Sequence, residues 1–217
     1  MRNTAKTTTR RPPAEAKPPK ARRDTRERLV EAATDLMWRR GISEFSVDQI
    51  LEGAGALRGS FYHFFPSKAD LILECLDRVW RAQSERLEEI YATAATPEQG
   101  VREHLKFLAQ IQIDAKAAFG FVPGTFNMSM PTSLLREDAR ISGRMRELME
   151  ENRRRLELAI QKIKRRRKLP LSAKTTARLL SYSWNGLVTA ARMENSLAPL
   201  DDLEAVLDQA LGGAVGA

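Results

Sequence analysis

Apolar side chains recur along most of this chain at intervals of roughly three to four residues, the spacing that gathers them on one face of an α-helix. Between Leu29 and Met37, for example, charged residues such as Glu31 and Asp35 fill the remaining faces. No stretch alternates with the two-residue period of a half-buried strand, so the pattern predicts an all-α fold. The predicted helices cover about 24–40, 47–54, 57–64, a stretch from 68, a stretch from 97, 138–168, 173–195 and 202–211.

Capping residues and helix breakers support these boundaries. Ser46 and Gln49 have the spacing of a capping box, in which each side chain bonds the other's backbone at the start of a helix. Gly55 follows the second predicted helix, where a left-handed residue commonly ends one. The expected caps of later helices are Ser67, Ser172 and Asp201.

The charge of the chain is concentrated at its beginning. The 217 residues include 36 Lys and Arg against 28 Asp and Glu, which gives a formal net charge of +8. Residues 1–23 alone hold eight of the bases and only one acid, and no large apolar residue follows Met1. Such a segment buries no core, so we expect residues 1–23 to be a disordered basic arm that meets an anionic partner.

Several classes of protein are disfavoured. Cys75 is the only cysteine, so neither a disulfide framework nor a multi-cysteine zinc module is expected. No apolar run approaches the roughly 18 residues of a membrane span, and the prolines of the arm oppose the amphipathic helix of an organelle leader. The sequence therefore predicts a cytoplasmic protein without membrane contact.

The sequence also predicts neither an enzyme nor a cofactor. The histidines, His63 and His104, lie at no metal-ligand spacing from each other or from Cys75. The glycines of 53–59 lack the nucleotide-binding spacing and follow a helix instead of a strand. Acidic pairs lie on charged helices, where solvated faces are the default. For Cys75, an apolar helical stripe favours a buried inert thiol over a redox sensor.

The segment 46–64 has the dimensions of a helix-turn-helix. In such a motif the first helix supports a second whose exposed side chains enter the DNA major groove, which is about 12 Å wide. We expect Leu57, Phe61 and Phe64 to face inward. The residues expected to face outward, which carry groups suited to phosphates, base edges and close backbone approach, are Arg58, Gly59, Ser60, Tyr62 and His63.

The run SVDQILEGAGALRGSFYHFFPSKADLI, preceded by ERLVEAATDLMWRRG, resembles the DNA-binding domain of the tetracycline-repressor (TetR) family of bacterial regulators. The resemblance implies phosphate contacts at Tyr62 and Lys68. It departs from the family at Leu57, where a Ser or Thr commonly caps the recognition helix. The full set of candidate DNA-binding residues is Ser46, Arg58, Gly59, Ser60, Tyr62, His63, Ser67 and Lys68.

By resemblance, the chain divides into the arm (1–23), a three-helix DNA-binding domain (24–70) and a helical domain (71–217) that binds a ligand and dimerises. The last two helices are then expected to form the homodimer interface. Packing inside one subunit is the alternative for these same residues. The small and apolar residues concerned are Ala177, Ser181, Gly186, Leu187, Val188, Ala190, Ala191, Leu203, Val206, Leu207 and Leu211.

Aromatic and methionine residues of the second domain are candidates for a mostly apolar ligand cavity with a few polar anchors. Ordinary core packing explains each of them taken singly, so the prediction rests on the group and on the resemblance. The effector is accordingly expected to be largely apolar. The candidate ligand-binding residues are Phe107, Phe119, Phe121, Phe126, Met128, Tyr182, Trp184 and Asn185, and of these Phe107, like Trp80 beside them, is a weaker candidate.

Together these observations predict a homodimeric repressor that binds double-stranded palindromic operator DNA and leaves it when a small molecule binds. Two alternatives remain at this stage. One is a sequence-nonspecific nucleic-acid-binding protein that uses mainly the basic arm. The other is a helical enzyme that uses the cavity.

Overall fold

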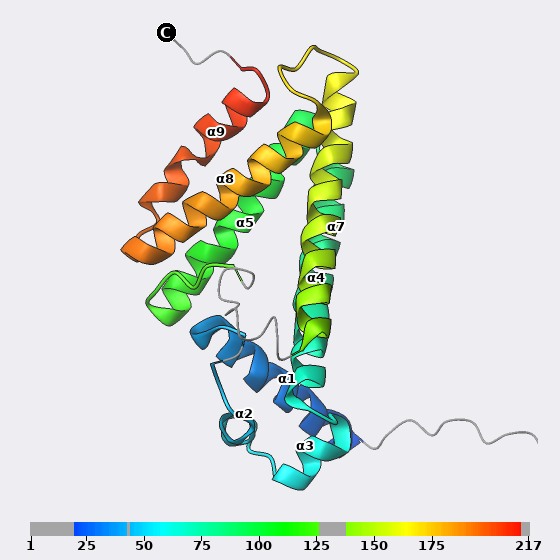
Figure 1. The fold of residues 1–217 in the computed structure, drawn as a ribbon, viewed down its shortest axis with the longest axis vertical. Helices are drawn as coiled ribbons and strands as arrows, with labels where there is room; N and C mark the ends of the chain where they lie inside the picture. Colours follow the sequence, from blue (N-terminus) through cyan, green and yellow to red (C-terminus); the bar gives the residue numbers. More distant parts are fainter. Residues whose placement is uncertain (1–19, 43, 126–137, 214–217) are drawn as a thin grey trace, which may run out of the picture.

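A computed structural model describes residues 20–42, 44–125 and 138–213, and the regular elements of these residues are all helices (Figure 1). The predicted all-α fold is confirmed. No helix in the described ranges is long and apolar enough to cross a membrane. The elements are α1 (Lys20–Arg40), α2 (Val47–Ala54), α3 (Arg58–Phe64), α4 (Lys68–Thr93), α5 (Pro97–Phe119), α7 (Ala139–Lys164), α8 (Ala173–Glu194), the 3₁₀-helix η1 (Ala198–Asp202) and α9 (Leu203–Ala210).

Side-chain caps fix most helix starts at the residues that the sequence predicts. The Ser46 hydroxyl accepts from the Gln49 amide at 3.2 Å, and the Ser46 amide donates to the Gln49 side chain at 2.9 Å, so the capping box is complete. Ser67 and Ser172 cap α4 and α8 in the same way. Gly55 ends α2 in the left-handed region, with φ 55°. Local hydrogen bonding is therefore sufficient to place these ends.

Three predicted ends were wrong. Helix α1 begins at Lys20, inside the segment predicted to be a disordered arm, while most of that arm (1–19) lies outside the described residues. Helix α7 ends at Lys164, four residues before the predicted end, in the basic run 162–168. Asp201 caps no helix, because Pro199 opens a tight 3₁₀ turn that contains Asp201, and α9 starts only after Asp202.

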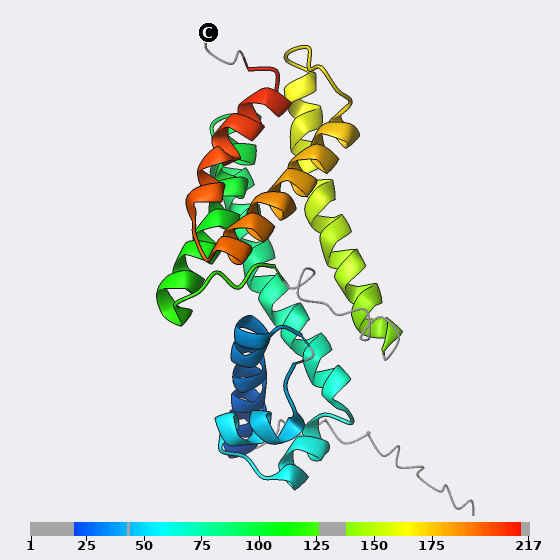
Figure 2. The same cartoon turned by 60° about the vertical axis from the view of Figure 1, so that its left-hand side comes forward.

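Two hydrophobic cores lie at the two ends of an elongated molecule (Figures 1 and 2). The first is built by α1, α2, α3 and the beginning of α4, and Phe61 and Leu71 are fully buried in it. The first half of α7 also packs there through Ile141, Met145 and Leu148. Helix α4 runs unbroken across the predicted domain boundary at residue 70. Thus α4 and α7 both connect the two ends of the molecule.

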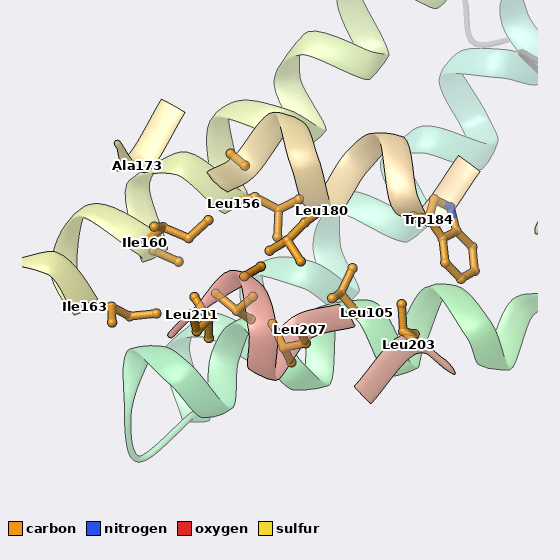
Figure 3. Close-up of a cluster of buried hydrophobic side chains, with 14 of the residues drawn as sticks. Leu105, Leu156, Ile160, Ile163, Ala173, Leu180, Trp184, Leu203, Leu207 and Leu211 are labelled. Carbon is orange, nitrogen blue, oxygen red and sulfur yellow. The ribbon is translucent and has the colours of Figure 1, made fainter. Parts of the chain in front are cut away.

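The second core joins α5, α7, α8 and α9 (Figure 3). Most residues expected at a homodimer interface are buried here, within one subunit. They are buried because α7 packs on α8, and the short helix α9 packs back onto α8 and α5. The expected interface residues that are buried in this core are Ala177, Val188, Ala191, Leu203, Leu207 and Leu211.

Candidate nucleic-acid interface and ligand cavity

The recognition helix α3 is anchored by aromatic residues on one side. Phe61 is fully buried, Phe65 nearly so, and Phe64 is half-buried. The expectation that Leu57 faces inward was wrong, since its side chain is 79% exposed. Leu57 occupies the N-cap position with extended backbone, and its side chain makes no capping hydrogen bond. The first turn of α3 therefore lacks the side-chain cap that α2 and α4 have.

The opposite side of α3 presents the polar residues expected to meet DNA. Arg58, Gly59, Tyr62 and His63 are exposed, and Ser60 is half-buried. A Cβ atom added at Gly59 would meet no heavy atom within 4 Å, so the backbone there is open to close approach by a partner. The structure thus brings these residues together on one exposed face of a seven-residue helix.

Arg58 is held by an ion pair across the turn. Its guanidinium pairs with the carboxylate of Asp48 in the first turn of α2. The hydrogen bond and the charge of Asp48 raise the pKa of Arg58 above its ordinary value. Because the pair joins α2 to α3, it orients the arginine before any partner arrives.

The other three candidate DNA-binding residues have structural roles. The Ser46 hydroxyl belongs to the capping box of α2. The Ser67 hydroxyl accepts from the Asp70 amide at 3.2 Å and donates to the Asp70 carboxylate at 2.6 Å. The Lys68 ammonium donates to the Phe45 backbone carbonyl at 2.6 Å and lies 4.8 Å from the centre of the Phe45 ring. Lys68 therefore ties α4 to the loop before α2.

A cavity of about 160 Å³ lies between the two cores. Helices α1, α4, α5, α7 and α8 all contribute to its walls. The apolar lining is extensive, and all three tryptophans of the chain belong to it. The lining includes Trp38, Trp80, Leu105, Gln112, Asn152, Arg153, Leu156, Tyr182, Trp184 and Asn185.

Four of the predicted ligand-binding residues, Tyr182, Trp184, Asn185 and the weaker candidate Trp80, line this cavity. Phe107 does not, because it lies off the α5 stripe that Leu105, Leu108 and Gln112 form. Two further candidates, Phe126 and Met128, lie outside the described residues.

Phe119 and Phe121 also lie away from the cavity. Their rings pack on each other at the end of α5, with 6.0 Å between centroids. The guanidinium of Arg39 lies 4.6 Å from the centre of the Phe119 ring. This aromatic pair therefore packs against α1 and takes no part in the lining.

Sequence reasoning missed two important lining residues, Trp38 and Arg153. Trp38 belongs to α1, which the sequence assigned to the DNA-binding domain. Arg153 lies in a highly charged run typical of a solvated helix face. Met145, Met149 and Arg153 are spaced four residues apart and therefore lie on one side of α7. Because both methionines line the cavity, this spacing is the only sequence signal that Arg153 faces inward.

Cys75 has the environment of an inert thiol. It is fully buried in the first core, and its sulfur donates to the Val30 carbonyl at 3.6 Å. Burial raises the pKa of Cys75 to about 11. Since the thiolate is the reactive form, this position favours structural packing over sensing.

Sequence comparison places the first core in a known family. Residues 29–75, from the middle of α1 into α4, match the family model described as bacterial regulatory proteins, tetR family. The HTH-type transcriptional repressor NemR of Escherichia coli K12 is 29% identical over 119 residues, which are 54% of this chain and 58% of NemR. The HTH-type transcriptional regulator EthR of Mycobacterium tuberculosis H37Rv is 36% identical over 83 residues, 38% of this chain and 37% of EthR. The matched residues span little more than half of the length of NemR and little more than a third of the length of EthR.

Solved structures extend the similarity to the whole fold. The crystal structure of E. coli NemR in its reduced form has a TM-score of 0.71 at 22% identity, covering 87% of this chain and 98% of that chain. A TetR-family transcriptional regulator from Cytophaga hutchinsonii has a TM-score of 0.75 at 16% identity, covering 93% and 100%. At such identities the likeness shows a common fold. By sequence, the similarity to the tetR family of bacterial regulatory proteins covers residues 29–75, and for the remaining described helices the similarity to TetR-family structures is one of fold.

Proposed function

We propose that this chain is a transcriptional repressor that binds a palindromic operator as a homodimer and is released by a small molecule in the cavity. The observation that carries the proposal is the position of the cavity. Its walls include Trp38 of α1 and residues of α4 and α7, which also build the core beneath the recognition helix. A ligand there contacts the same helices that hold α3.

The exposed face of α3 is suited to the major groove. The groove accepts one helix, and Arg58, Tyr62 and His63 are exposed on α3, whereas Phe61 is buried. Arginine is the commonest reader of guanine, and tyrosine hydroxyls commonly contact phosphate. Gly59 permits close approach of the backbone.

The outer face of α8 is a better homodimer candidate than the buried residues expected from the sequence. Leu179, Tyr182 and Met193 are 42%, 59% and 82% exposed. With Gly186 and Thr189 they follow the alternating three- and four-residue spacing of a helix-pairing seam. Gly186 has open space around its backbone, which permits close contact with a second copy.

Release requires that the ligand prefer one arrangement of the dimer over another. A twofold dimer places its two recognition helices in half-sites about 34–36 Å apart, or a multiple of that spacing. A ligand that binds equally well to the DNA-competent and incompetent forms changes nothing. In this proposal the preferred ligand-bound form is the one whose recognition helices no longer match that spacing.

Selection of operators from random duplexes tests the proposal. The purified full chain is expected to enrich a palindrome and to bind it as a dimer in a gel-shift assay, well above a scrambled duplex of equal length at the same salt. A variant that lacks residues 2–20 is expected to bind less tightly, with a shallower salt dependence and nearly the same sequence preference. The absence of any enriched sequence would contradict the proposal and favour the nonspecific alternative, for which the relatives give no support. The relatives compared above are named as regulators, so they give no support to the enzyme alternative either.

A further inference from the structure

Arg153 is the one charged side chain among the described residues that line the cavity. No Asp or Glu is among those residues, and most of the lining is aliphatic or aromatic. Water screens a largely buried cation among apolar side chains less than it screens a cation on the surface. The formal charge among the described lining residues is therefore positive, and Glu150, which pairs with Arg153, is not one of them.

The Arg153 guanidinium has hydrogen-bonding capacity to spare. Its side chain is only 18% exposed, and Nη1 donates to the Glu150 carboxylate at 2.7 Å. Glu150 lies one helical turn earlier, and its side chain is 68% exposed. The buried Nε atom has no hydrogen-bond partner within the described part of the chain. A buried donor without an acceptor is costly, so an acceptor in the cavity would be favoured at this atom.

Features beside Arg153 disfavour a cationic ligand. The rings of Trp80 and Tyr182 would attract a cation, but arginines already lie near them. The Arg155 guanidinium is 5.2 Å from the Trp80 ring centre, and the Arg153 guanidinium is 5.9 Å from that of Tyr182. A cationic ligand would meet like charges and no carboxylate of the wall.

The polar amide of Gln112 is already engaged. Its amide nitrogen donates to the Gly124 carbonyl at 3.2 Å, and its oxygen accepts from the Gly124 amide at 3.1 Å. Gln112 thus closes the wall beside Gly124. Arg153 offers the ligand a positively charged donor, and the buried Oδ1 of Asn152, which has no hydrogen-bond partner within the described residues, offers it an acceptor.

We propose that the effector is a small apolar acid whose carboxylate is bound by Arg153 and whose ring or short chain packs against Leu105, Leu156 and Trp184. This inference rests on the proposed function, because it identifies the ligand of the cavity with the effector. A volume of about 160 Å³ suits a ring-sized ligand, since an apolar cavity of about 150 Å³ in another protein holds benzene. The planar guanidinium fork matches a carboxylate in two parallel hydrogen bonds.

Tryptophan fluorescence of the full chain tests the proposal directly, because all three tryptophans line the cavity. The probes are phenylacetate, phenylacetamide and 2-phenylethylammonium, which share one ring and differ in charge. Phenylacetate is expected to bind about tenfold or more tightly than the neutral amide, as a charge-assisted hydrogen bond to a buried group implies. The ammonium compound is expected to bind most weakly.

Two variants separate the role of Arg153 from a general effect of charge. Arg153→Gln is expected to reduce the preference for phenylacetate over phenylacetamide from about tenfold to near unity. Arg154→Gln removes the same charge from an exposed neighbour that does not line the cavity, and is expected to keep the preference. Thermal unfolding followed by circular dichroism establishes that both variants are folded, and Arg153→Lys, which keeps a point charge, is expected to retain part of the preference.

Three results would overturn the proposal. One is equal or tighter binding of the amide or ammonium probe. Another is a carboxylate preference that survives Arg153→Gln. The third is no fluorescence change with any probe in a folded protein that still binds its operator. If phenylacetate binds through Arg153 but leaves operator binding unchanged, the ligand class stands and the proposed release mechanism fails.

Discussion

Arg140, at the start of α7, donates from Nη1 to Oδ1 of Asp70, in the first turn of α4, across a distance of 2.7 Å. The same aspartate accepts a hydrogen bond from the hydroxyl of Ser67, the cap of α4. Hydrogen bonds from Ser67 and then from Arg140 hold the pKa of Asp70 below its ordinary value. The pair therefore joins α7, which lines the cavity, to the point where the chain leaves the recognition helix.

Asp70→Asn tests whether this ion pair transmits ligand binding. The change keeps the shape of the side chain but removes the charge that Arg140 meets. We expect the ratio of operator affinities without and with ligand to fall a few-fold, because an ion pair with an exposed member is worth about 1 kcal/mol or less. Operator gel shifts measure the ratio, and tryptophan fluorescence verifies that the ligand still binds.

Glu147→Gln is the matched control for Asp70→Asn. Glu147 pairs with Arg144 on the same helix, with 3.0 Å between Arg144 Nη1 and Glu147 Oε2, so its pairing links no second helix. This variant is expected to keep the wild-type ratio. An unchanged ratio in Asp70→Asn as well would exclude the pair from the coupling.

Recognition of phosphates and of bases is expected to separate, with Tyr62 of α3 and Lys68 of α4 on phosphates and Ser60 of α3 on bases. Tyr62→Phe and Lys68→Ala should each weaken operator binding by about 1 kcal/mol with little change in sequence preference, since phosphate contacts carry no direct sequence information. Ser60→Ala should instead relax the preference at one base pair. Parallel selections on a randomised operator measure both effects. The reverse pattern would show that a different face of α3 meets the groove.

The missing cap of α3 offers a stabilising substitution. Leu57 is 79% exposed and has the extended backbone of an N-cap residue, so Leu57→Ser loses little burial and gains a capping hydrogen bond. We expect the free energy of unfolding to rise by about 1 kcal/mol, and Ser46→Ala, which breaks an existing capping box, to lower it by about 1 kcal/mol. Urea unfolding measures both changes. A Leu57→Ser variant less stable than the parent would mean that the leucine has an apolar contact worth more than a cap.

His104 makes the stability of the second core depend on pH. It is fully buried, and its Nδ1 lies 2.8 Å from the Tyr91 hydroxyl. Burial, opposed in smaller part by the Asn152 side chain, lowers the pKa of His104 from 6.5 to about 3. Between these values the unfolded chain binds a proton that the folded chain does not. The His104 contribution to stability is therefore complete above pH 6.5 and is lost as the pH falls toward 3.

The slope of this effect is at most about 1.4 kcal/mol per pH unit. Comparison with His104→Gln isolates it, since the other titrating groups are common to both proteins. Urea unfolding at pH 7.5, 6.0 and 5.0 is expected to show the parent losing stability relative to the variant only in the two acidic samples. Parallel curves across this range would mean that the histidine binds protons alike in the folded and unfolded chains.

Local signals in the sequence were enough to predict the helices, several of their caps and the recognition motif. Ser46 and Gln49 lie within one turn, and Gly55 ends α2 through its own backbone, so these features need no distant partner. The outward set on α3 followed from helical spacing around Phe61. The failures at Leu57 and Asp201 were also local, since each depends on the direction of one side chain or on one tight turn.

The tertiary structure alone decided what each helix face meets. Helical spacing predicts that Val188 and Leu207 share apolar faces, but only the packing of α9 onto α8 buries them inside one subunit. The same spacing cannot rank Phe119 against Arg153 as cavity residues, because the cavity forms where five helices distant in sequence converge. Periodicity fixes an angle around one helix axis, whereas burial depends on the relative placement of several axes, and this placement turned a charged residue toward an apolar cavity.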